Sequence, residues 1–262
     1  MRFIHKLPPV RVARSRDEAI LELCRNKTVL HLGFVDEGLL EERIERGEWL
    51  HEKLVRSAER VIGFDISAQG VARARQLGFL DCYVVDVERL DSAIEVPKLS
   101  YDVILAADII EHVDNPGSFL TALQPIVGPG TTLVITTPNA LSLKTFWYPP
   151  AKLEVVHPDH NCYFSPLTLT HLLAKYGFEV TATTVYSPKF IPDKGNITGL
   201  WDFARKWSFV AVNSVLRHTL VSIFPFFNDG LLVTACKVVR DVGTRGGTLQ
   251  QVCSSKLLMT QS

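Results

Sequence analysis

Residues 101–120 read YDVILAADIIEHVDNPGSFL, an apolar run that leads into acidic residues, a histidine and an Asn-Pro pair. The run is continuously apolar instead of alternating, which is typical of a strand buried on both faces of a parallel sheet. Residues 116–126, after the polar turn, have the amphipathic pattern of a helix. This stretch therefore predicts a buried strand, a polar turn and a helix, in that order.

The same alternation extends outward on both sides. Amphipathic segments at 39–57, 68–77 and 166–176 lie between further apolar runs, a pattern that indicates βαβ units. We therefore expect the fold class α/β, with a Rossmann-like, doubly wound sheet between two layers of helices. The sheet should have seven strands, mostly parallel, with an antiparallel last strand. The expected strands are residues 27–33, 60–65, 80–86, 101–107, 130–137, 178–186 and 230–239.

The chain is expected to form one large domain. Its 262 residues are 47% hydrophobic, enough for a sizeable buried core. Residues 1–26 are interpreted as an N-terminal extension with a helix, 27–240 as the domain, and 241–262 as a loose tail. The last two strands lack a crossover helix, so they should form an antiparallel hairpin at the sheet edge, interrupted by an insertion at 187–226.

The insertion contains an apolar segment, WSFVAVNSVLRHTLVSIFPFF, at residues 207–227. Polar residues such as Arg217 interrupt it, so it falls short of the roughly 20 apolar residues of a membrane span. Its apolar residues recur at helical spacing, which favours an amphipathic helix that covers a binding site as a lid. Peripheral contact with a membrane surface is the alternative interpretation. The residues at this spacing are Phe209, Val212, Leu216, Leu220 and Ile223.

Charge and cysteine content limit the partners. Lysine plus arginine and aspartate plus glutamate number 28 each, and no basic cluster stands out, so the electrostatic footprint of a nucleic-acid binder is missing. The five cysteines are scattered and odd in number, which favours a reducing, cytoplasmic location over a disulfide framework. The N-terminal residues lack the apolar core of a signal peptide. No feature points to a particular oligomeric state.

Four segments end strands with residues suited to a ligand. HLGFVDEG (31–38) follows the first strand, Asp65 and Asp86 end the next two, and AADIIEHVDNP (106–116) ends the fourth. In an open α/β sheet, ligands bind outside the carboxyl ends of the strands. Gly33 lets the backbone approach a ligand, Asp65 can accept hydrogen bonds from both ribose hydroxyls, and Asp86 can receive an adenine amino group. Each carboxylate could instead cap the following helix, but together they favour a nucleoside site.

The order of these segments resembles the class I S-adenosylmethionine-dependent methyltransferases, in particular the branch with the ubiquinone-biosynthesis O-methyltransferases and bacterial saccharide methyltransferases. YDVILAADIIEHVDNPGSFL is similar to the fourth-strand motif of that branch, and GPGTTLVITTPNALSL (128–143) to its fifth-strand motif. HPDHNCYFSPLTLTHLLAKYGFEV (157–180) is similar to the segment that follows. The resemblance covers residues 27–186 and the last strand.

The resemblance implies S-adenosylmethionine as the cofactor. The resemblance also implies that Asp65 holds the ribose of the cofactor and that Asp86 and the backbone at Val87 hold its adenine. The backbone near Ala107 would face the methionine part of the cofactor. The full set of implied cofactor contacts is Gly33, Asp65, Ile66, Asp86, Val87 and Ala107.

The first loop departs from the family pattern of an acidic residue followed by alternate glycines. His31 stands at the acidic position and Val35 at the second glycine. This disfavours a nicotinamide-dependent oxidoreductase, because a pyrophosphate needs bare backbone at a helix N-terminus. S-adenosylmethionine carries no phosphate and tolerates fewer glycines, and Asp36 or Glu37 can replace the lost acid.

Methyl transfer to a hydroxyl needs a base with a pKa near neutrality, and histidine fits. The candidates are His112, His157 and His160. Each has a structural alternative: His112 can cap or pack the helix after the fourth strand, and the other two can clamp a polar loop with Asp159. No metal is assigned, since HPDH lacks the i,i+4 ligand spacing of a helical metal site.

Two functions of different classes follow. The first is S-adenosylmethionine-dependent O-methylation of a small molecule, such as a saccharide, a lipid-linked glycan or a quinone precursor. The alternative is a catalytically silent methyltransferase-like module that binds a partner, which the altered first loop and the apolar segment 207–227 support.

Overall fold

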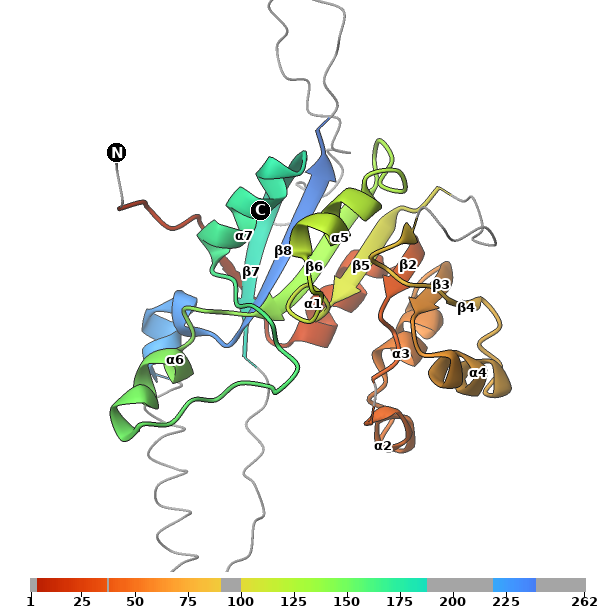
Figure 1. Cartoon of the computed structure of the whole chain (residues 1–262), viewed down its shortest axis with the longest axis horizontal. Helices are drawn as coiled ribbons and strands as arrows, with labels where there is room; N and C mark the ends of the chain where they lie inside the picture. Colours follow the sequence, from red (N-terminus) through yellow and green to blue (C-terminus); the bar gives the residue numbers. More distant parts are fainter. Residues whose placement is uncertain (1–3, 37, 91–99, 188–218, 239–262) are drawn as a thin grey trace, which may run out of the picture.

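A computed structural model describes residues 4–36, 38–90, 100–187 and 219–238. In these residues a single mixed sheet has the strand order β1-β7-β8-β6-β5-β2-β3-β4, with helices along both of its faces (Figure 1). The strands are β1 (Arg11–Val12), β2 (Thr28–Leu32), β3 (Arg60–Asp65), β4 (Cys82–Val84), β5 (Val103–Ala107), β6 (Thr132–Pro138), β7 (Phe178–Tyr186) and β8 (Gly230–Lys237). The helices are α1 (Arg16–Cys24), α2 (Leu40–Glu45), α3 (Leu50–Ser57), α4 (Ala68–Gln76), α5 (Pro116–Leu123), α6 (Leu143–Trp147) and α7 (Pro166–Lys175), with 3-10 turns at Pro149–Ala151 and Pro225–Phe227.

Different helices cover the two faces of the sheet. On one face, buried side chains of α5 and α7, such as Leu123, pack in a cluster with Ile104 of β5. On the other face, Ile20 of α1 and Leu54 of α3 pack in a cluster with Val103, the neighbour of Ile104 in the same strand. Successive strand residues point to opposite faces, so this alternation places the sheet between two helical layers. The predicted three-layer α/β/α fold is confirmed.

The strands on one side of the sheet align their carboxyl ends. β6, β5, β2, β3 and β4 run parallel to one another. In their register, Leu32 of β2 lies beside Phe64 of β3 and Ala106 of β5, and Asp65 lies beside Val84 of β4. The segments that follow these strands therefore gather along one edge, where open α/β sheets bind ligands.

The sheet differs from the sequence-based expectation at its other side. A two-residue strand, β1, pairs in parallel with β7 and brings the described sheet to eight strands instead of seven. It is too short and too exposed to give an apolar pattern. The last two strands, β7 and β8, pair antiparallel as predicted; β8 lies between β6 and β7, and in the described sheet only the short β1 lies beyond β7. The side chains of β8 are buried along nearly the whole strand, which suits a position with a neighbour on each side.

Two predicted elements have different bounds. The single helix expected at 39–57 is two helices, α2 and α3, separated by a turn at Gly47 with a φ of +64°. Glycine adopts this left-handed conformation without the steric cost that a side chain would bring. The strand expected at 80–86 is only Cys82–Val84.

The insertion and the tail fall largely outside this structure. Most of 187–226 and all of 241–262 lie beyond the described residues, so the lid and the membrane-surface contact of 207–227 stay predictions. Across the ranges that the structure describes, no helix has the length and apolar character needed to cross a membrane.

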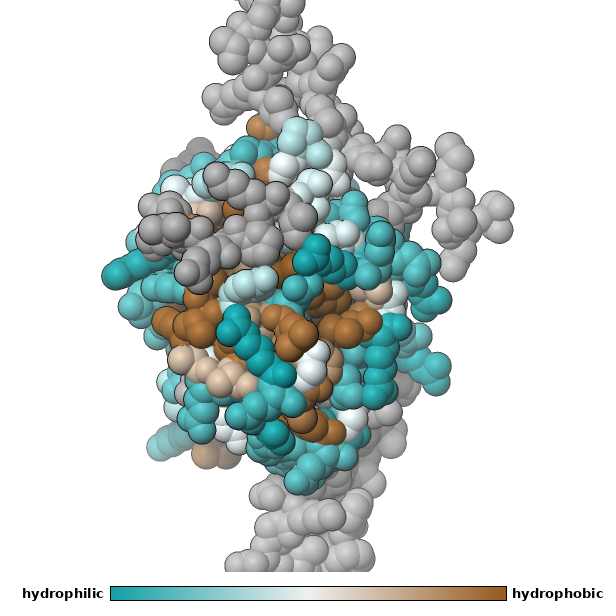
Figure 2. Space-filling model, turned by 90° about the vertical axis from the view of Figure 1, so that its right-hand side faces the viewer, coloured by the Kyte–Doolittle hydropathy of each residue, from teal (hydrophilic) through white to brown (hydrophobic). Residues whose placement is uncertain are grey.

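The β4 side of the molecule carries exposed apolar side chains. Figure 2 shows them near the middle of this face, surrounded by hydrophilic residues. Leu80 and Val84 at this edge are 73% and 54% exposed. Since β4 has only three residues, it offers little unpaired backbone for another strand to join.

Candidate functional site

The backbone turns sharply at Gly33, directly after β2. Gly33 has a φ of +59°, and a Cβ added there would lie 2.7 Å from Cδ1 of Ile109, in the segment after β5. Its N–H donates to the carbonyl of Phe64 at 2.7 Å, which holds the loop beside β3. This position needs glycine both for its conformation and for space.

The two bulky residues of the first loop pack back into the protein. Phe34 is 2% exposed, and its ring lies where a Cβ on Gly63, in the middle of β3, would stand. A Cβ on Gly70 of α4 would lie 2.4 Å from Cγ1 of Val35, so the missing side chain at Gly70 makes room for the valine. Trp49 donates from Nε1 to the carbonyl of Phe34 at 2.9 Å. The departure from the glycine pattern is therefore compensated by glycines elsewhere, and these side chains do not fill the carboxyl edge.

His31, at the usual acidic position, does not face a ligand. It is 2% exposed, stacks on His51, and the two Nδ1 atoms are 3.3 Å apart. Burial lowers the pKa of His51 to about 4 and that of His31 well below its usual value, so both rings are neutral. Asp36, a suggested replacement acid, pairs with Arg43 at 3.3 Å, and burial raises its pKa. Glu37, the other suggestion, lies outside the described residues.

Asp65 is held in a fixed orientation at the end of β3. Its side chain is nearly buried, and its carboxylate accepts the N–H of Val35 at 2.8 Å through Oδ2 and the N–H of Ser67 at 2.9 Å through Oδ1. These two bonds fix both oxygens of the carboxylate at the carboxyl end of β3. Ser67 is the residue that caps α4, through the N–H of Gly70. The capping role that Asp65 could have filled thus belongs to Ser67, which favours the ligand interpretation.

The other predicted cofactor residues lie along the same edge. Ile66, after Asp65, is 69% exposed, an unusual state for an isoleucine and one that suits an apolar ligand surface. Asp86 follows β4 and accepts the N–H of Glu88 at 2.9 Å, so it also organises its own turn. Val87 packs against the core and Ala107 ends β5. The structure thus brings Gly33, Asp65, Ile66, Asp86, Val87 and Ala107 to the ends of four adjacent strands.

A charged network at the end of β5 was not found by sequence reasoning. Asp108 has a left-handed φ of 53°, accepts the hydroxyl of Thr136 at 2.8 Å, and pairs with Arg16 of α1. Arg16 also contacts Asp17, which binds Lys53 of α3 at 2.7 Å. Because Arg16 and Asp108 are 92 residues apart, no local pattern could reveal the pair. It places a guanidinium beside the methionine side of the predicted site.

Glu111 lies under this edge without a polar partner. Its side chain is fully buried, and among the described residues neither carboxylate oxygen has a hydrogen-bond partner. Burial, assisted by the Asp108 carboxylate, raises the pKa of Glu111 to about 8. The carboxyl group is therefore largely protonated at neutral pH.

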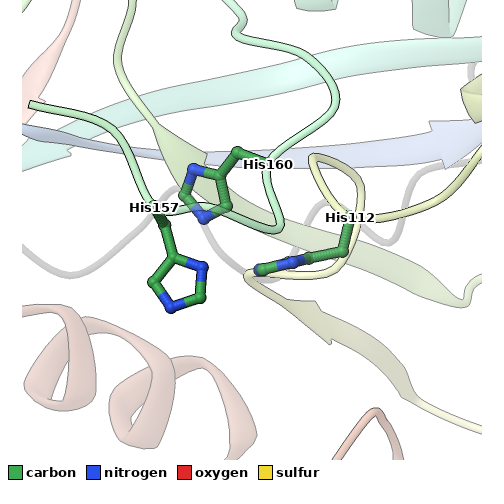
Figure 3. A group of neighbouring side chains, drawn as sticks. All are labelled: His112, His157 and His160. Carbon is green, nitrogen blue, oxygen red and sulfur yellow. The ribbon is translucent and has the colours of Figure 1, made fainter. Parts of the chain in front are cut away.

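The three candidate bases come together. His112 follows β5, while His157 and His160 belong to the loop before α7, and their rings point toward one another (Figure 3). The ring centroids of His112 and His160 are 4.6 Å apart, and those of His157 and His160 are 5.2 Å apart. We call these three residues the histidine cluster. The structure thus brings the three candidate bases to one place.

Comparison with known proteins agrees with this arrangement. The family model described as a methyltransferase domain matches residues 40–183. A ubiquinone biosynthesis O-methyltransferase of Bradyrhizobium diazoefficiens is 30% identical over 71% of this chain and 76% of the relative. One from Rhodopseudomonas palustris strain BisA53 is 28% identical over 76% and 80%. The alignment with another, from strain BisB18, is 32% identical but spans only 52% of this chain and 53% of the relative.

Solved structures support the fold. The [4+2]-cyclase SpnF has a TM-score of 0.50 at 16% identity, covering 86% of this chain and 81% of its own. A Bacillus halodurans C-125 protein assigned as a methyltransferase has the same TM-score and identity, covering 84% and 96%. At this identity the likeness concerns the fold alone, and one fold can carry different reactions.

The sheet, its helical layers and the residues at its carboxyl edge define a Rossmann-like class I methyltransferase fold. The chain belongs to the methyltransferase domain family, the S-adenosylmethionine-dependent methyltransferases. S-adenosylmethionine is the cofactor of this family, and the residues at the edge fit it. An aspartate is held at the end of β3 by two backbone N–H groups, and an apolar side chain is exposed beside it.

Proposed function

We propose that this protein transfers the methyl group of S-adenosylmethionine to a hydroxyl group of a small molecule: a quinone precursor, a saccharide or a lipid-linked glycan. The observation that carries the proposal is that two groups of side chains lie along one edge of the sheet. Asp65 is fixed at the end of β3, where the nucleoside would bind, and a cluster of imidazoles lies beyond the end of β5. Methyl transfer needs both, because a donor and an acceptor must meet in line.

The nucleoside half uses residues that are already in position. Asp65 would accept the two ribose hydroxyls, and the exposed side chain of Ile66 would cover one face of the adenine. Asp86 and the backbone of Val87 would bind the adenine edge. Arg16, beside Asp108, is placed to attract the carboxylate of the methionine part.

The acceptor half depends on the histidine cluster. S-adenosylmethionine, when bound, supplies a methyl group on a positively charged sulfur. An imidazole of the cluster would take the proton of the acceptor hydroxyl as its oxygen bonds to the methyl carbon. Orienting two reactants can lower a barrier by about 7–11 kcal/mol, so a fixed loop matters as much as the base.

Hydrogen bonds fix the end of the insertion beside β6. Asn139, after β6, donates from Nδ2 to the carbonyls of Phe226 and Asn228 at 2.8 and 2.9 Å. The end of the insertion is thereby tied beside the strands that lead to the histidine cluster. A lid formed by 207–227 would then select the acceptor, and the names of the relatives favour a quinone precursor.

The test separates the enzyme from a silent module. Calorimetry with S-adenosylmethionine and S-adenosylhomocysteine should give one site for each ligand. Radioactive methyl transfer to a panel of phenolic quinone precursors and saccharides should then identify an acceptor, with activity lost on heating. If the folded protein gives no heat with either ligand, the enzyme is excluded and the partner-binding module is favoured. Binding without transfer to any hydroxyl compound would contradict the acceptor class.

A further inference from the structure

The histidine cluster has the composition and spacing of a metal site. Each of His112, His157 and His160 offers one ring nitrogen, and these three nitrogens lie within 4.8 Å of one another. The ring planes of His112 and His160 are nearly perpendicular, at 85°, whereas those of His157 and His160 are 35° apart. The three rings point toward one another (Figure 3), which brings their nitrogens close together.

Hydrogen bonds fix the two segments that carry the rings. The N–H of Asn161 donates to the carbonyl of Glu111 at 2.7 Å, and its Nδ2 donates to the carbonyl of His112 at 2.8 Å. Cys162 adds a contact from Sγ to the carbonyl of Ile110 at 3.5 Å. The loop before α7 is therefore joined, directly after His160, to the turn that carries His112. A site assembled in this way does not need the i,i+4 spacing whose absence argued against a metal.

The neighbours of the rings resemble the outer contacts of metal-binding histidines. The hydroxyl of Tyr163 lies 3.3 Å from Nδ1 of His160, so that nitrogen is occupied and Nε2 is left for a ligand. Nδ1 of His157 accepts the backbone N–H of Asp159 at 3.3 Å, and the Asp159 carboxylate lies 3.8 Å from the same nitrogen. Ligating histidines commonly contact a carboxylate or another polar group through the second nitrogen. A negative charge beside the cluster also favours a cation.

The spacing can close to that of a bound ion. Zinc binds imidazole nitrogen at about 2.0–2.1 Å, which places the nitrogens of a tetrahedral site about 3.3 Å apart. The largest separation here, within 4.8 Å, is about 1.5 Å wider at most, a gap that small side-chain rotations can remove. Imidazole ligands suit zinc, copper, iron and nickel, whereas magnesium and calcium prefer oxygen.

We propose that His112, His157 and His160 together bind one divalent transition-metal ion, with Zn²⁺ the best match. Three protein ligands leave a position open for water or for the acceptor, as in catalytic zinc sites. Metal binding stands on the geometry of the rings alone, whereas its action on the acceptor rests on the proposed function. There the metal would replace a single imidazole base: the acceptor hydroxyl, acidified by the ion, gives its proton to water. Its oxygen bonds to the methyl carbon while the electron pair of the carbon–sulfur bond goes to sulfur.

Cobalt titration tests the site without any cofactor or acceptor. The full chain, freed of any affinity tag and treated with a chelator, is titrated with Co²⁺, and the visible absorption spectrum is recorded. One equivalent should give the band of four- or five-coordinate Co²⁺, and Zn²⁺ should displace it. His157→Ala and His160→Ala should each weaken binding at least about 100-fold, beyond the usual effect of an outer contact. His171→Ala removes an exposed histidine of α7 and should change nothing.

One substitution reports on ligation directly. In His157→Cys, Co²⁺ should give an additional near-ultraviolet band from a cobalt–thiolate bond, which arises only if the side chain at this position is a ligand. Circular dichroism checks that each variant is folded. The proposal is overturned if the wild-type chain binds no Co²⁺ at one equivalent, or if His171→Ala weakens binding as much as the cluster variants. It is also overturned if the folded His157→Cys variant binds Co²⁺ without the thiolate band. Since none of these readouts involves methyl transfer, their failure leaves the proposed function standing.

Discussion

Replacing Glu111 by glutamine should stabilise the protein at neutral and alkaline pH. The side chain is fully buried, and its pKa rises from 4.5 to about 8 through burial and the nearby Asp108 carboxylate. Between these two values the folded protein keeps a proton on Glu111 that the unfolded chain has lost. The contribution of this group to stability is therefore complete below pH 4.5 and is lost as the pH rises to about 8.

The size of the effect follows from the shift. One pKa unit corresponds to about 1.4 kcal/mol, so ionising Glu111 in place lowers the free energy of unfolding by up to about 5 kcal/mol above pH 8. Glutamine cannot ionise, and a buried amide without a partner costs less than a buried carboxylate. Glu111→Gln should thus match the wild type at pH 5 and exceed its stability by about 3–5 kcal/mol at pH 8.5.

Urea unfolding followed by circular dichroism at pH 5, 6.5 and 8.5 measures this difference. The matched control is Glu48→Gln at an exposed position, which should leave the pH dependence of the wild type unchanged. Parallel stability curves for Glu111→Gln and the wild type over this range would refute the reasoning, because they would mean that Glu111 does not titrate abnormally.

Three further predictions concern the packing, a buried histidine and an ion pair around the site. Gly70→Ala places a methyl group 2.4 Å from Val35 and should lower the free energy of unfolding by about 1–2 kcal/mol in urea. Adding Val35→Gly to Gly70→Ala should restore part of the lost stability, because it removes the clashing side chain. Gly128→Ala is the control and should be almost neutral, since its nearest contact is at 3.6 Å. If the effects of Gly70→Ala and Val35→Gly on the free energy of unfolding simply add in the double variant, the account is contradicted. The pKa of buried His51 is lowered to about 4, so wild-type stability should fall as the pH drops below 6.5. His51→Gln should flatten that part of an acid-unfolding curve, and an unaltered curve would argue against a neutral buried ring. Arg16→Gln should lower the free energy of unfolding by about 1–2 kcal/mol in thermal unfolding, because the Asp108 carboxylate loses its ion pair. A variant as stable as the wild type would show that the ion pair contributes nothing to stability.

The layers of the fold could be predicted because each apolar run has the period of its own element. Strands buried on both faces read as continuous apolar runs, and the helices between them as amphipathic segments. The order of β8 in the sheet could not be predicted in this way, since an apolar run does not say which strands flank it. The break between α2 and α3 was missed because the apolar positions continue across Gly47.

The residues of the proposed nucleoside site were easier to bring together from the sequence than those of the proposed acceptor site. Gly33 and Asp65 end strands that are neighbours in the sheet, so sequence order together with topology places them side by side. The histidine cluster and the Arg16–Asp108 pair join segments that are far apart in the chain, and no local spacing announces such contacts. The compensation of Val35 by Gly70 is equally non-local, although a glycine inside a helix is a signal that something packs closely there.

Calorimetric titration of S-adenosylhomocysteine into Asp65→Ala tests the central claim most directly. Two hydrogen bonds from ribose hydroxyls to a carboxylate contribute about 1.5–3 kcal/mol each, so the affinity of the folded variant should fall at least about 100-fold. Asp81→Ala is the matched control. Among the contacts described for its side chain, the Asp81 carboxylate pairs only with Arg60. The Asp81→Ala variant should therefore bind S-adenosylhomocysteine like the wild type. If Asp65→Ala keeps the wild-type affinity, the nucleoside does not lie at the end of β3 and the account fails.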